Sequence, residues 1–379
     1  MMILGSKKIL WPVFLLGVLA IFLSVPTARA QGTKDLPPPP PLWKAKPTPT
    51  PKPVVPEVID SDDVIKTNSN LIMVPVSVTD PTTGQAVQGL QVTDFRLDEE
   101  GKQQDISGLG NPEQVPLAIA LLFDISSSTS QKGFFASQQT AAATFLKLVM
   151  KPTDRAAIFT ITGTATMVQP LSSAEASAAK MTSIPAATTS VPTAFYDTVI
   201  AAAKYLTTNA PGNFRRVIVV LSDGDDNNSE QVKSEAAADY RDTTAGKQEV
   251  LGTRASLLSA HARAVSVVQR HVQKADVIFY SVNPGGPSIK LNLIATRAER
   301  GMEAIAETTG GTAFVPDSDK DLERVFRQVA AELRGQYLLQ YYGKSDAPAS
   351  QFRRITVTVP ARADVRIRAR QGYYPKKQD

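Results

Sequence analysis

Oxygen-bearing side chains at three places in this sequence have the types and spacing of a binding site for a hard cation. Asp124, Ser126 and Ser128 occupy alternate positions directly after a continuous apolar run, and Asp223 follows a second apolar run. Thr193 lies between them in the chain, where a helical segment begins. Carboxylates and hydroxyls without histidine or cysteine suit Mg²⁺, Mn²⁺ or Ca²⁺. The sequence therefore predicts a divalent-cation site, provided that the fold brings the three segments together.

Helix capping is the simpler interpretation of either cluster alone, because aspartate and serine are favoured N-cap residues. Two clusters and a threonine at corresponding strand ends favour cation binding over capping. Asp225 and Asp226 come next in the chain. We interpret them as a solvated acidic turn, with outer ligands of the ion as the alternative.

The composition excludes most other site chemistry. The 379 residues include no cysteine and two histidines, so thiolate zinc sites, iron–sulfur clusters and cysteine nucleophiles are ruled out. The sequence also lacks a Gly-x-Ser-x-Gly elbow, a glycine-rich phosphate loop and a His-Glu-x-x-His motif. We therefore expect that the protein is not an enzyme.

Apolar runs alternate with helical segments over residues 115–335. Strands are predicted at 117–123, 156–161, 166–171, 217–221, 277–282 and 312–315, and helices at 131–150, 193–206 and about 322–333. This alternation predicts an α/β fold with a doubly wound, mostly parallel sheet, in which ligands bind beyond the carboxyl ends of the strands. A polar, alanine-rich stretch at 231–255 is predicted to be a helical or loop insertion at the sheet edge.

Short alternating segments flank the α/β region on both sides. Apolar residues at alternate positions from Ile72 to Val78 share one strand face, and alternation at 355–359 and 365–369 predicts a C-terminal hairpin. We expect the two flanks to pair into one small antiparallel β unit, because an isolated hairpin is only marginally stable.

Arginines concentrate near the C-terminus, where six of them and one acidic residue lie between Arg353 and Arg370. Arg366, Arg368 and Arg370 alternate with apolar residues and therefore share one strand face. We favour a solvated face that blocks edge-to-edge aggregation. A groove for an anionic polymer is the alternative.

The first thirty residues have the pattern of an export signal. Lys7 and Lys8 precede an apolar run that ends at Ala28-Arg29-Ala30, a small-x-small cleavage pattern. An uncleaved anchor is the alternative, and no membrane span is expected after cleavage. Cleavage would lower the formal charge from +5 to +2, because the segment holds three basic and no acidic residues. That balance gives no reason to expect nucleic-acid binding.

The residues of the predicted cation site carry a family resemblance. Asp-x-Ser-x-Ser at 124–128, a distant threonine and Ser-Asp-Gly at 222–224 resemble the metal-ion-dependent adhesion site of von Willebrand factor type A (vWA) domains. The flanks, with "GLQVTDFRLDEEGK" before and "LRGQYLLQYY" after, look similar to secreted bacterial proteins with an acidobacterial-type vWA-related domain.

The resemblance implies a role for each site residue. Ser126 and Ser128 would bind the cation through their hydroxyls, and Thr193 would join directly or through water. Asp124 and Asp223 would supply negative charge, directly or through water. With two carboxylates the ion keeps an open position, which this family fills with an acidic residue of its partner.

These expectations divide the chain into five parts, which are an export signal (1–30), a proline-rich linker (31–63), an N-terminal β segment (64–112), a vWA domain (113–335) and a C-terminal β segment (336–379). We expect a secreted, periplasmic or cell-envelope module of a bacterium, which uses Mg²⁺, or Mn²⁺ or Ca²⁺, to capture a Glu or Asp carboxylate of a protein ligand. The alternative is an assembly scaffold of the envelope that is indifferent to metal.

Overall fold

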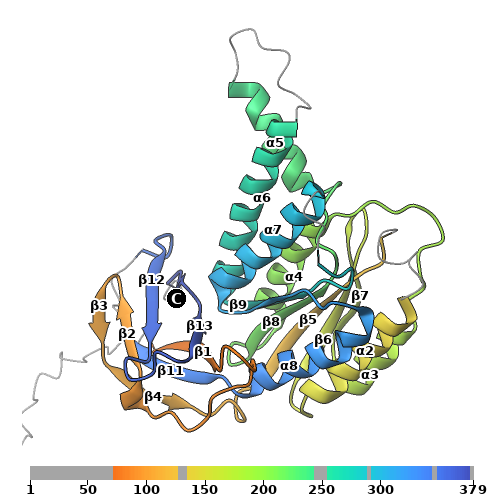
Figure 1. Ribbon diagram of the computed structural model, residues 1–379. Coiled ribbons are helices and arrows are strands. Elements are labelled where there is room, and N and C mark those ends of the chain that lie inside the picture. Colours follow the sequence, from red (N-terminus) through yellow and green to blue (C-terminus); the bar gives the residue numbers. More distant parts are fainter. Residues whose placement is uncertain (1–70, 127–134, 243–253, 288–291, 344–347, 376–379) are drawn as a thin grey trace, which may run out of the picture. The chain divides into compact units, whose positions relative to one another are not determined.

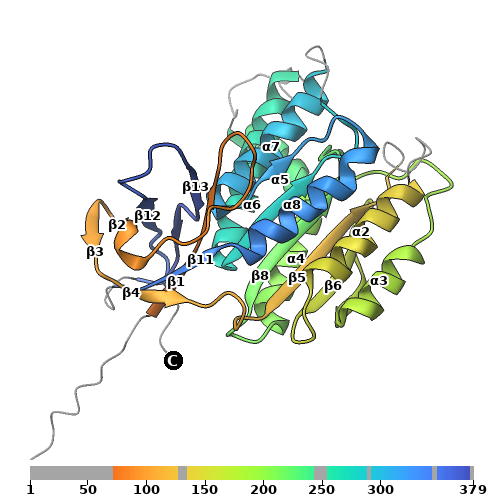
Figure 2. The same ribbon diagram turned by 60° about the horizontal axis from the view of Figure 1, so that its bottom comes forward.

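The structure is a computed structural model that describes residues 71–126, 135–242, 254–287, 292–343 and 348–375. The predicted export signal, the proline-rich linker and Ser128 lie outside these residues. Within them, a six-stranded sheet with helices on both sides is joined to two four-stranded antiparallel sheets (Figures 1 and 2).

The six-stranded sheet has the order β10-β9-β8-β5-β6-β7. Its strands are β5 (Leu117–Asp124), β6 (Arg155–Ile161), β7 (Ala165–Ser172), β8 (Arg215–Leu221), β9 (Val277–Val282) and β10 (Ala313–Phe314). Neighbouring strands are parallel except β6 and β7, which are antiparallel. Strand β5 is buried at every position, as expected for a strand covered on both faces.

Alternate side chains of β5 enter two separate cores, one on each face of the sheet. Leu121 and its neighbours in register pack with α2 (Phe135–Val149), α3 (Ala174–Thr182) and α8 (Leu322–Arg334). Leu122 and the small residues Ala118 and Ala120 face the core formed with α4 (Phe195–Asn209), α6 (Arg254–Lys274) and α7 (Leu293–Thr309). The predicted doubly wound α/β fold is confirmed. None of the described helices is both long enough and apolar enough to cross a membrane.

The polar stretch at 231–255 does not form an insertion at the sheet edge. Its described part belongs to α5 (Glu230–Asp242) and to the start of α6, and these two helices pack on each other. They lie in the connection from β8 to β9, which are inner strands, whereas the edge strands are β7 and β10. The prediction failed because helical periodicity does not say which strands a helix connects.

The two flanks of the α/β region form a sandwich of two antiparallel sheets. One sheet has the order β13-β1-β11-β4 and the other β14-β12-β2-β3. The strands are β1 (Leu71–Thr79), β2 (Arg96–Glu99), β3 (Lys102–Gln104), β4 (Ile106–Gly110), β11 (Tyr337–Tyr342), β12 (Arg353–Thr358), β13 (Arg366–Ala369) and β14 (Gly372–Tyr373), with 3₁₀ turns η1 (Val92–Asp94) and η2 (Asp319–Asp321). Val74, Leu97, Leu339 and Ile355 meet in their shared core, so the predicted antiparallel unit is confirmed.

The predicted C-terminal hairpin is wrong. Strand β12 pairs with β2 and β14, whereas β13 pairs with β1 in the opposite sheet. The chain therefore crosses from one sheet to the other between these strands. A hairpin would leave its apolar face uncovered, but strands in facing sheets bury Ile355 and Ile367 against the same core.

The interpretation of the arginine face as solvated is also wrong for two of its three members. Arg366 is exposed, but the side chains of Arg368 and Arg370 are only 14% and 11% exposed. Arg368 forms an ion pair of 2.6 Å with Glu332 of α8, and Arg370 forms one with Asp276 before β9. The alternation of arginines with apolar residues along β13 showed that the arginines share one face of the strand. It did not show that α8 and the segment before β9 cover most of that face.

The ion pair of Arg368 belongs to a buried polar network between the sandwich and the α/β region. Tyr280 of β9 donates to Glu332 at 3.2 Å, and Gln336 donates to Ser77 of β1 at 3.3 Å.

The backbones of the two parts also approach closely. Gly310, which ends α7 at φ 80°, lies so close to β13 that a Cβ there would be 2.7 Å from the Ala369 carbonyl carbon. The described residues all belong to one compact unit, and the boundaries at 113 and 335 stay predictions.

Arg368→Met is expected to lower the free energy of unfolding by about 3–5 kcal/mol, because Glu332 would keep a buried charge without its cation. Urea unfolding of both proteins measures this loss. The matched control is Arg366→Met on the same strand, where the exposed side chain predicts a change within about 0.5 kcal/mol. Equal stabilities of the two variants would contradict the role assigned to Arg368.

Candidate functional site

The ends of two adjacent parallel strands bring the predicted carboxylates to one edge of the sheet. Strands β5 and β8 pair in a register that places Phe123 opposite Leu221. Asp124, the last residue of β5, and Ser222, the first after β8, therefore lie at the same level, and Asp223 comes one position later. This is the carboxyl edge, where open α/β sheets bind their ligands.

Asp124 is completely buried and held by groups from both strands. Its Oδ1 accepts a hydrogen bond of 2.8 Å from the Ser126 amide, and its Oδ2 accepts one of 2.5 Å from the Ser222 hydroxyl. Burial, and next the charge of Asp223, raise the pKa of Asp124 to about 6, against the lowering effect of these hydrogen bonds. The carboxylate is thus held in a fixed orientation by hydrogen bonds from the loops after β5 and β8.

The other residues of the predicted cation site differ in burial and in their place relative to helix α4. Ser126 and Thr193 are buried at 1% and 4% exposure, and Asp223 is half-buried with no ion pair within the described residues. Helix α4 begins at Phe195 with Ala194 as its N-cap, so Thr193 precedes the helix rather than opening it as predicted. Ser128 lies outside the described residues.

Thr193 is tied to the loop after β8 by its backbone. The Thr193 amide donates to Oδ1 of Asn227 at 2.8 Å, and its carbonyl accepts from the amides of Asn227 and Asn228 at 3.0 Å. The segment that carries Thr193 is therefore attached to the loop that carries Asp223. No pattern in the sequence pointed to the two asparagines.

A glycine permits the tight turn after Asp223. Gly224 has φ 74°, in the left-handed region, and its amide donates to the Ser222 hydroxyl at 2.9 Å. A Cβ at this position would lie 2.7 Å from the Met302 methyl carbon. Ser222 therefore bridges Asp124 and the turn, a role that its place between a buried strand and Asp223 could have suggested.

The interpretation of Asp225 and Asp226 as a solvated turn is wrong for Asp226, whereas the Asp225 side chain is 31% exposed, and their role as outer ligands stays a prediction. Asp226 is 2% exposed and accepts hydrogen bonds from the Tyr196 amide and from the amide and hydroxyl of Ser229, so it caps the start of α4. Asp225 forms a 2.7 Å ion pair with Arg297 of α7. Burial raises the pKa of both carboxyl groups.

The donor set fits a hard divalent cation. Two carboxylates near enough for one charge to raise the pKa of the other stand beside the buried hydroxyl residues Ser126 and Ser222. Within the described residues there is no group of three or more His, Cys, Asp or Glu side chains arranged for a metal. A cation here would therefore depend on hydroxyls as well as carboxylates, which favours Mg²⁺, Mn²⁺ or Ca²⁺.

Comparison with known protein families assigns most of the α/β region to one family. Residues 118–328 match the von Willebrand factor type A domain. Similar solved structures include an aerotolerance-related membrane protein from Bacteroides fragilis, with 16% identity and a TM-score of 0.37, covering 56% of this chain and 98% of that one. A von Willebrand factor type A protein from Catenulispora acidiphila has 14% identity and a TM-score of 0.41, covering 71% and 51%.

A third similar structure is proximal thread matrix protein 1 from the mussel byssus, with zinc in its metal-ion-dependent adhesion site (MIDAS) motif. It has 16% identity and a TM-score of 0.41, covering 61% of this chain and 49% of that one. This chain thus spans about half the length of the mussel and Catenulispora proteins. Comparison with curated proteins finds no match.

The raised pKa of Asp124 predicts how stability depends on pH in the metal-free protein. Between about pH 4 and 6 the folded chain keeps a proton that the unfolded chain has released, so the free energy of unfolding falls as pH rises and then levels off. Asp124→Asn removes this fall, which is on the order of 3 kcal/mol.

Urea unfolding of both proteins in EDTA from pH 4 to 8 measures the effect. Because all other titrating groups are shared, the difference between the two curves reports Asp124 together with its coupling to Asp223. The variant is expected to gain stability relative to the wild type as pH rises to about 6. Parallel curves would contradict the assigned pKa.

Proposed function

Because the chain belongs to the von Willebrand factor type A domain family, we propose that it is a binding module in which a divalent cation captures an acidic group of a protein partner. The observation that carries this proposal is the placement of buried Asp124 beside Asp223 at the ends of two adjacent strands. Two like charges in a poorly solvated place favour a bound cation.

The chain's own residues would hold the ion in different ways. The hydroxyls of Ser126 and Thr193 are the proposed neutral ligands, together with Ser128, which the family resemblance adds. Asp124 and Asp223 are the proposed sources of negative charge, directly or through water. The ion, when bound, would supply a positive charge toward which a partner carboxylate is drawn. Mg²⁺ is our first choice, with Mn²⁺ and Ca²⁺ as alternatives.

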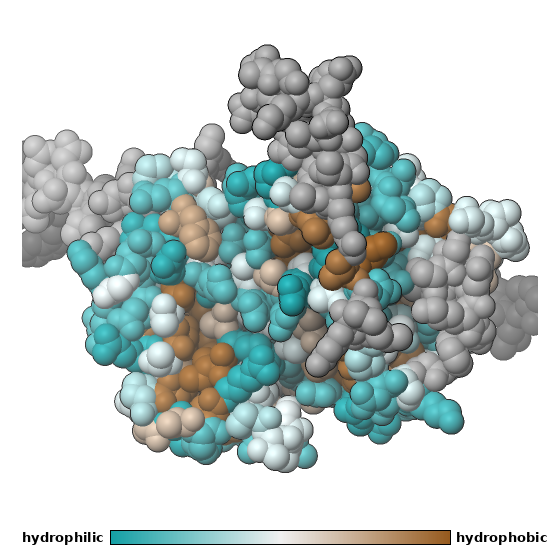
Figure 3. Space-filling model, turned by 45° about the horizontal axis from the view of Figure 1, so that its top comes forward, coloured by the Kyte–Doolittle hydropathy of each residue, from teal (hydrophilic) through white to brown (hydrophobic). Residues whose placement is uncertain are grey.

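Exposed apolar side chains at the same edge of the sheet support a protein as the partner. Helices α6 and α7 both begin on the carboxyl side of the sheet, because each runs back toward the amino end of the next strand, and the long α6 begins beyond the strand ends (Figure 1). Leu257 and Leu258 near the start of α6, and Leu293 and Ile294 at the start of α7, are 40–54% exposed. Figure 3 shows apolar side chains gathered among hydrophilic ones on the face viewed there. The start of each helix thus offers a pair of exposed apolar side chains that a protein partner could cover.

We also propose that the protein is exported and has no enzymatic activity. Export rests on the charged, apolar and small-residue pattern of the first thirty residues. The histidines give no support for acid–base chemistry at the site, because His261 is buried against Tyr196 and burial lowers its pKa to about 4. A scaffold that is indifferent to metal is the competing function.

Mg²⁺ is expected to raise the midpoint of thermal unfolding of the purified protein and to give a saturable heat of binding in calorimetry, since a ligand of the folded state stabilises it. Asp124→Ala should abolish both effects because it removes the carboxylate between β5 and β8. The matched control is Asp317→Ala, which removes an exposed carboxylate just after β10 and should leave both effects intact. Absence of both effects in the wild type would refute the cation site.

Partner capture is expected to depend on the cation. Envelope extract passed over the immobilised protein with Mg²⁺ should yield a retained protein that EDTA releases and that Asp124→Ala fails to retain. Retention unchanged by EDTA would instead favour the scaffold, and free glutamate-containing peptide should compete only if a carboxylate is recognised.

A further inference from the structure

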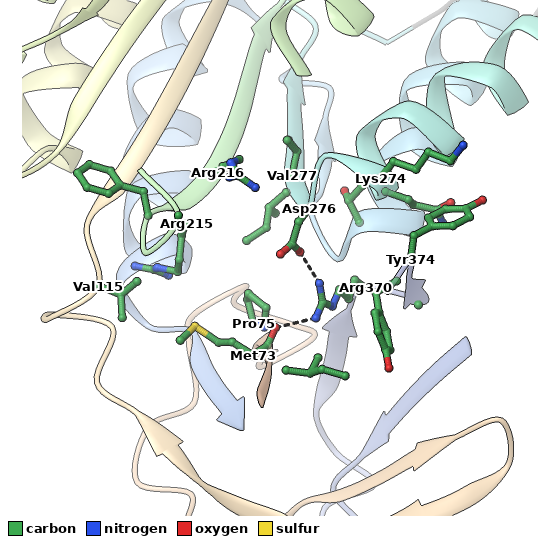
Figure 4. A pocket seen from close by; sticks show the side chains of 18 of the residues that line it. Met73, Pro75, Val115, Arg215, Arg216, Lys274, Asp276, Val277, Arg370 and Tyr374 are labelled. Atoms are coloured by element: carbon green, nitrogen blue, oxygen red, sulfur yellow. Dashed lines mark hydrogen bonds and ion pairs between the residues drawn. The ribbon is translucent and has the colours of Figure 1, made fainter. Parts of the chain in front are cut away.

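A second site lies where the sandwich meets the amino ends of the α/β strands. The cavity there has a volume of about 300 Å³ and is lined by the starts of β1, β8 and β9, the end of α6 and the residues around β14 (Figure 4). Strand β8 contributes Arg215 and Arg216 to the cavity at one end and leads to Asp223 at the other. Its seven residues separate the two places by roughly 20 Å.

The cavity has more positive than negative groups. Arg215, Arg216, Lys274 and Arg370 line it, and Asp276 is the only acidic residue among its described lining residues. The ion pair with Asp276 neutralises Arg370, as the dashed line in Figure 4 shows. The other three cations make no ion pair within the described part of the chain.

The hydrogen bonds of the two β8 arginines go to neutral oxygens, although the charges of Asp154 and Glu113 also act on Arg215. Arg215 is 7% exposed and donates to the Leu333 carbonyl at 3.1 Å and to Oε1 of Gln336 at 3.0 Å. Arg216 donates to the Ala275 carbonyl at 3.2 Å. In the described residues, the Nε groups of Arg215, Arg216 and Arg370 are all buried without a hydrogen-bond partner. Buried charged donors without acceptors are costly, and an anion in the neighbouring cavity would offset part of that cost through its charge rather than by bonding to these Nε atoms.

The remaining walls combine apolar side chains with a few neutral polar ones, such as Asn213 and Thr308. Met73 and Pro75 of β1, together with Val115 and Val277, lie around the charged groups in Figure 4. The Lys274 ammonium stands 5.2 Å from the ring centre of Tyr374 at one side of the cavity. A volume of about 300 Å³ is at the lower end of small-molecule pockets and too small for a folded partner.

We propose that this cavity binds a small amphipathic organic anion, with one carboxylate, sulfonate or phosphate group on an apolar body of one or two rings. Its anionic group would meet Arg216 and the neighbouring cations, and its apolar body would cover Met73 and Val277. Because the lining comes from both the sandwich and the α/β region, the ligand would hold the two together. Its site is separate from the proposed cation site.

The probe is naphthalene-2-sulfonate, titrated into the purified protein by calorimetry, with uncharged 2-naphthol as the matched ligand. We expect one sulfonate per chain, and 2-naphthol at least about ten-fold weaker because its hydroxyl carries no negative charge to pair with the arginines. Arg216→Gln should weaken the sulfonate about ten-fold. Arg366→Gln, which alters an exposed arginine outside the cavity, should leave its affinity unchanged.

A variant that binds the sulfonate more tightly must still be folded, so it distinguishes an effect on the cavity from a general loss of structure. Asp276→Asn removes the acidic residue of the cavity and should tighten sulfonate binding several-fold, and asparagine tolerates the φ of 55° found there. No saturable binding, equal binding of 2-naphthol, or unchanged affinity in both Arg216→Gln and Asp276→Asn would each overturn the proposal. Failure of Mg²⁺ binding alone would leave it standing, since it does not use Asp124.

Discussion

The burial of a carboxylate at the end of the central strand is the constraint around which the site is organised. Asp124 has no exposed surface, and burial together with the charge of Asp223 raises its pKa. The Ser126 amide and the Ser222 hydroxyl orient the group, and Gly224 lets the chain turn sharply enough to provide the second contact. These donors fix the orientation of the Asp124 carboxylate, and the nearby charge of Asp223 adds a second negative group, which together favour a bound cation.

The sandwich is more than an attachment to the α/β region. Arg368 and Glu332 form a buried ion pair between them, and Gln336 links Arg215, Ser77 and Tyr280 beside it. A chain without cysteine has no disulfide to fix such a junction, so packing and buried polar contacts must do so. Because one partner without the other would leave a buried charge, the ion pair also fixes how the two parts dock.

Strand β8 connects two regions of opposite electrostatic character. Its carboxyl end leads to Asp223 and the proposed cation site, whereas Arg215 and Arg216 at its amino end face a cavity with excess positive charge. Between them, Val217 to Leu221 are buried on both faces of the sheet. The buried apolar middle of the strand keeps the two charged regions apart, so the proposed cation and the proposed anion would bind at separate places.

Local pattern in the sequence determined the element types, the doubly wound sheet and the three segments that carry Asp124, Thr193 and Asp223, because burial on two faces and strand-end polarity are visible along the chain. Pairing between distant segments was not visible there. Three features depend on contacts between residues far apart in sequence. These are the pairing of β13 with β1 instead of β12, the ion pair that covers Arg368, and the capping of α4 by Asp226. The sequence thus determined which groups could do chemistry, and only the tertiary structure decided which of them are already occupied by other parts of the protein.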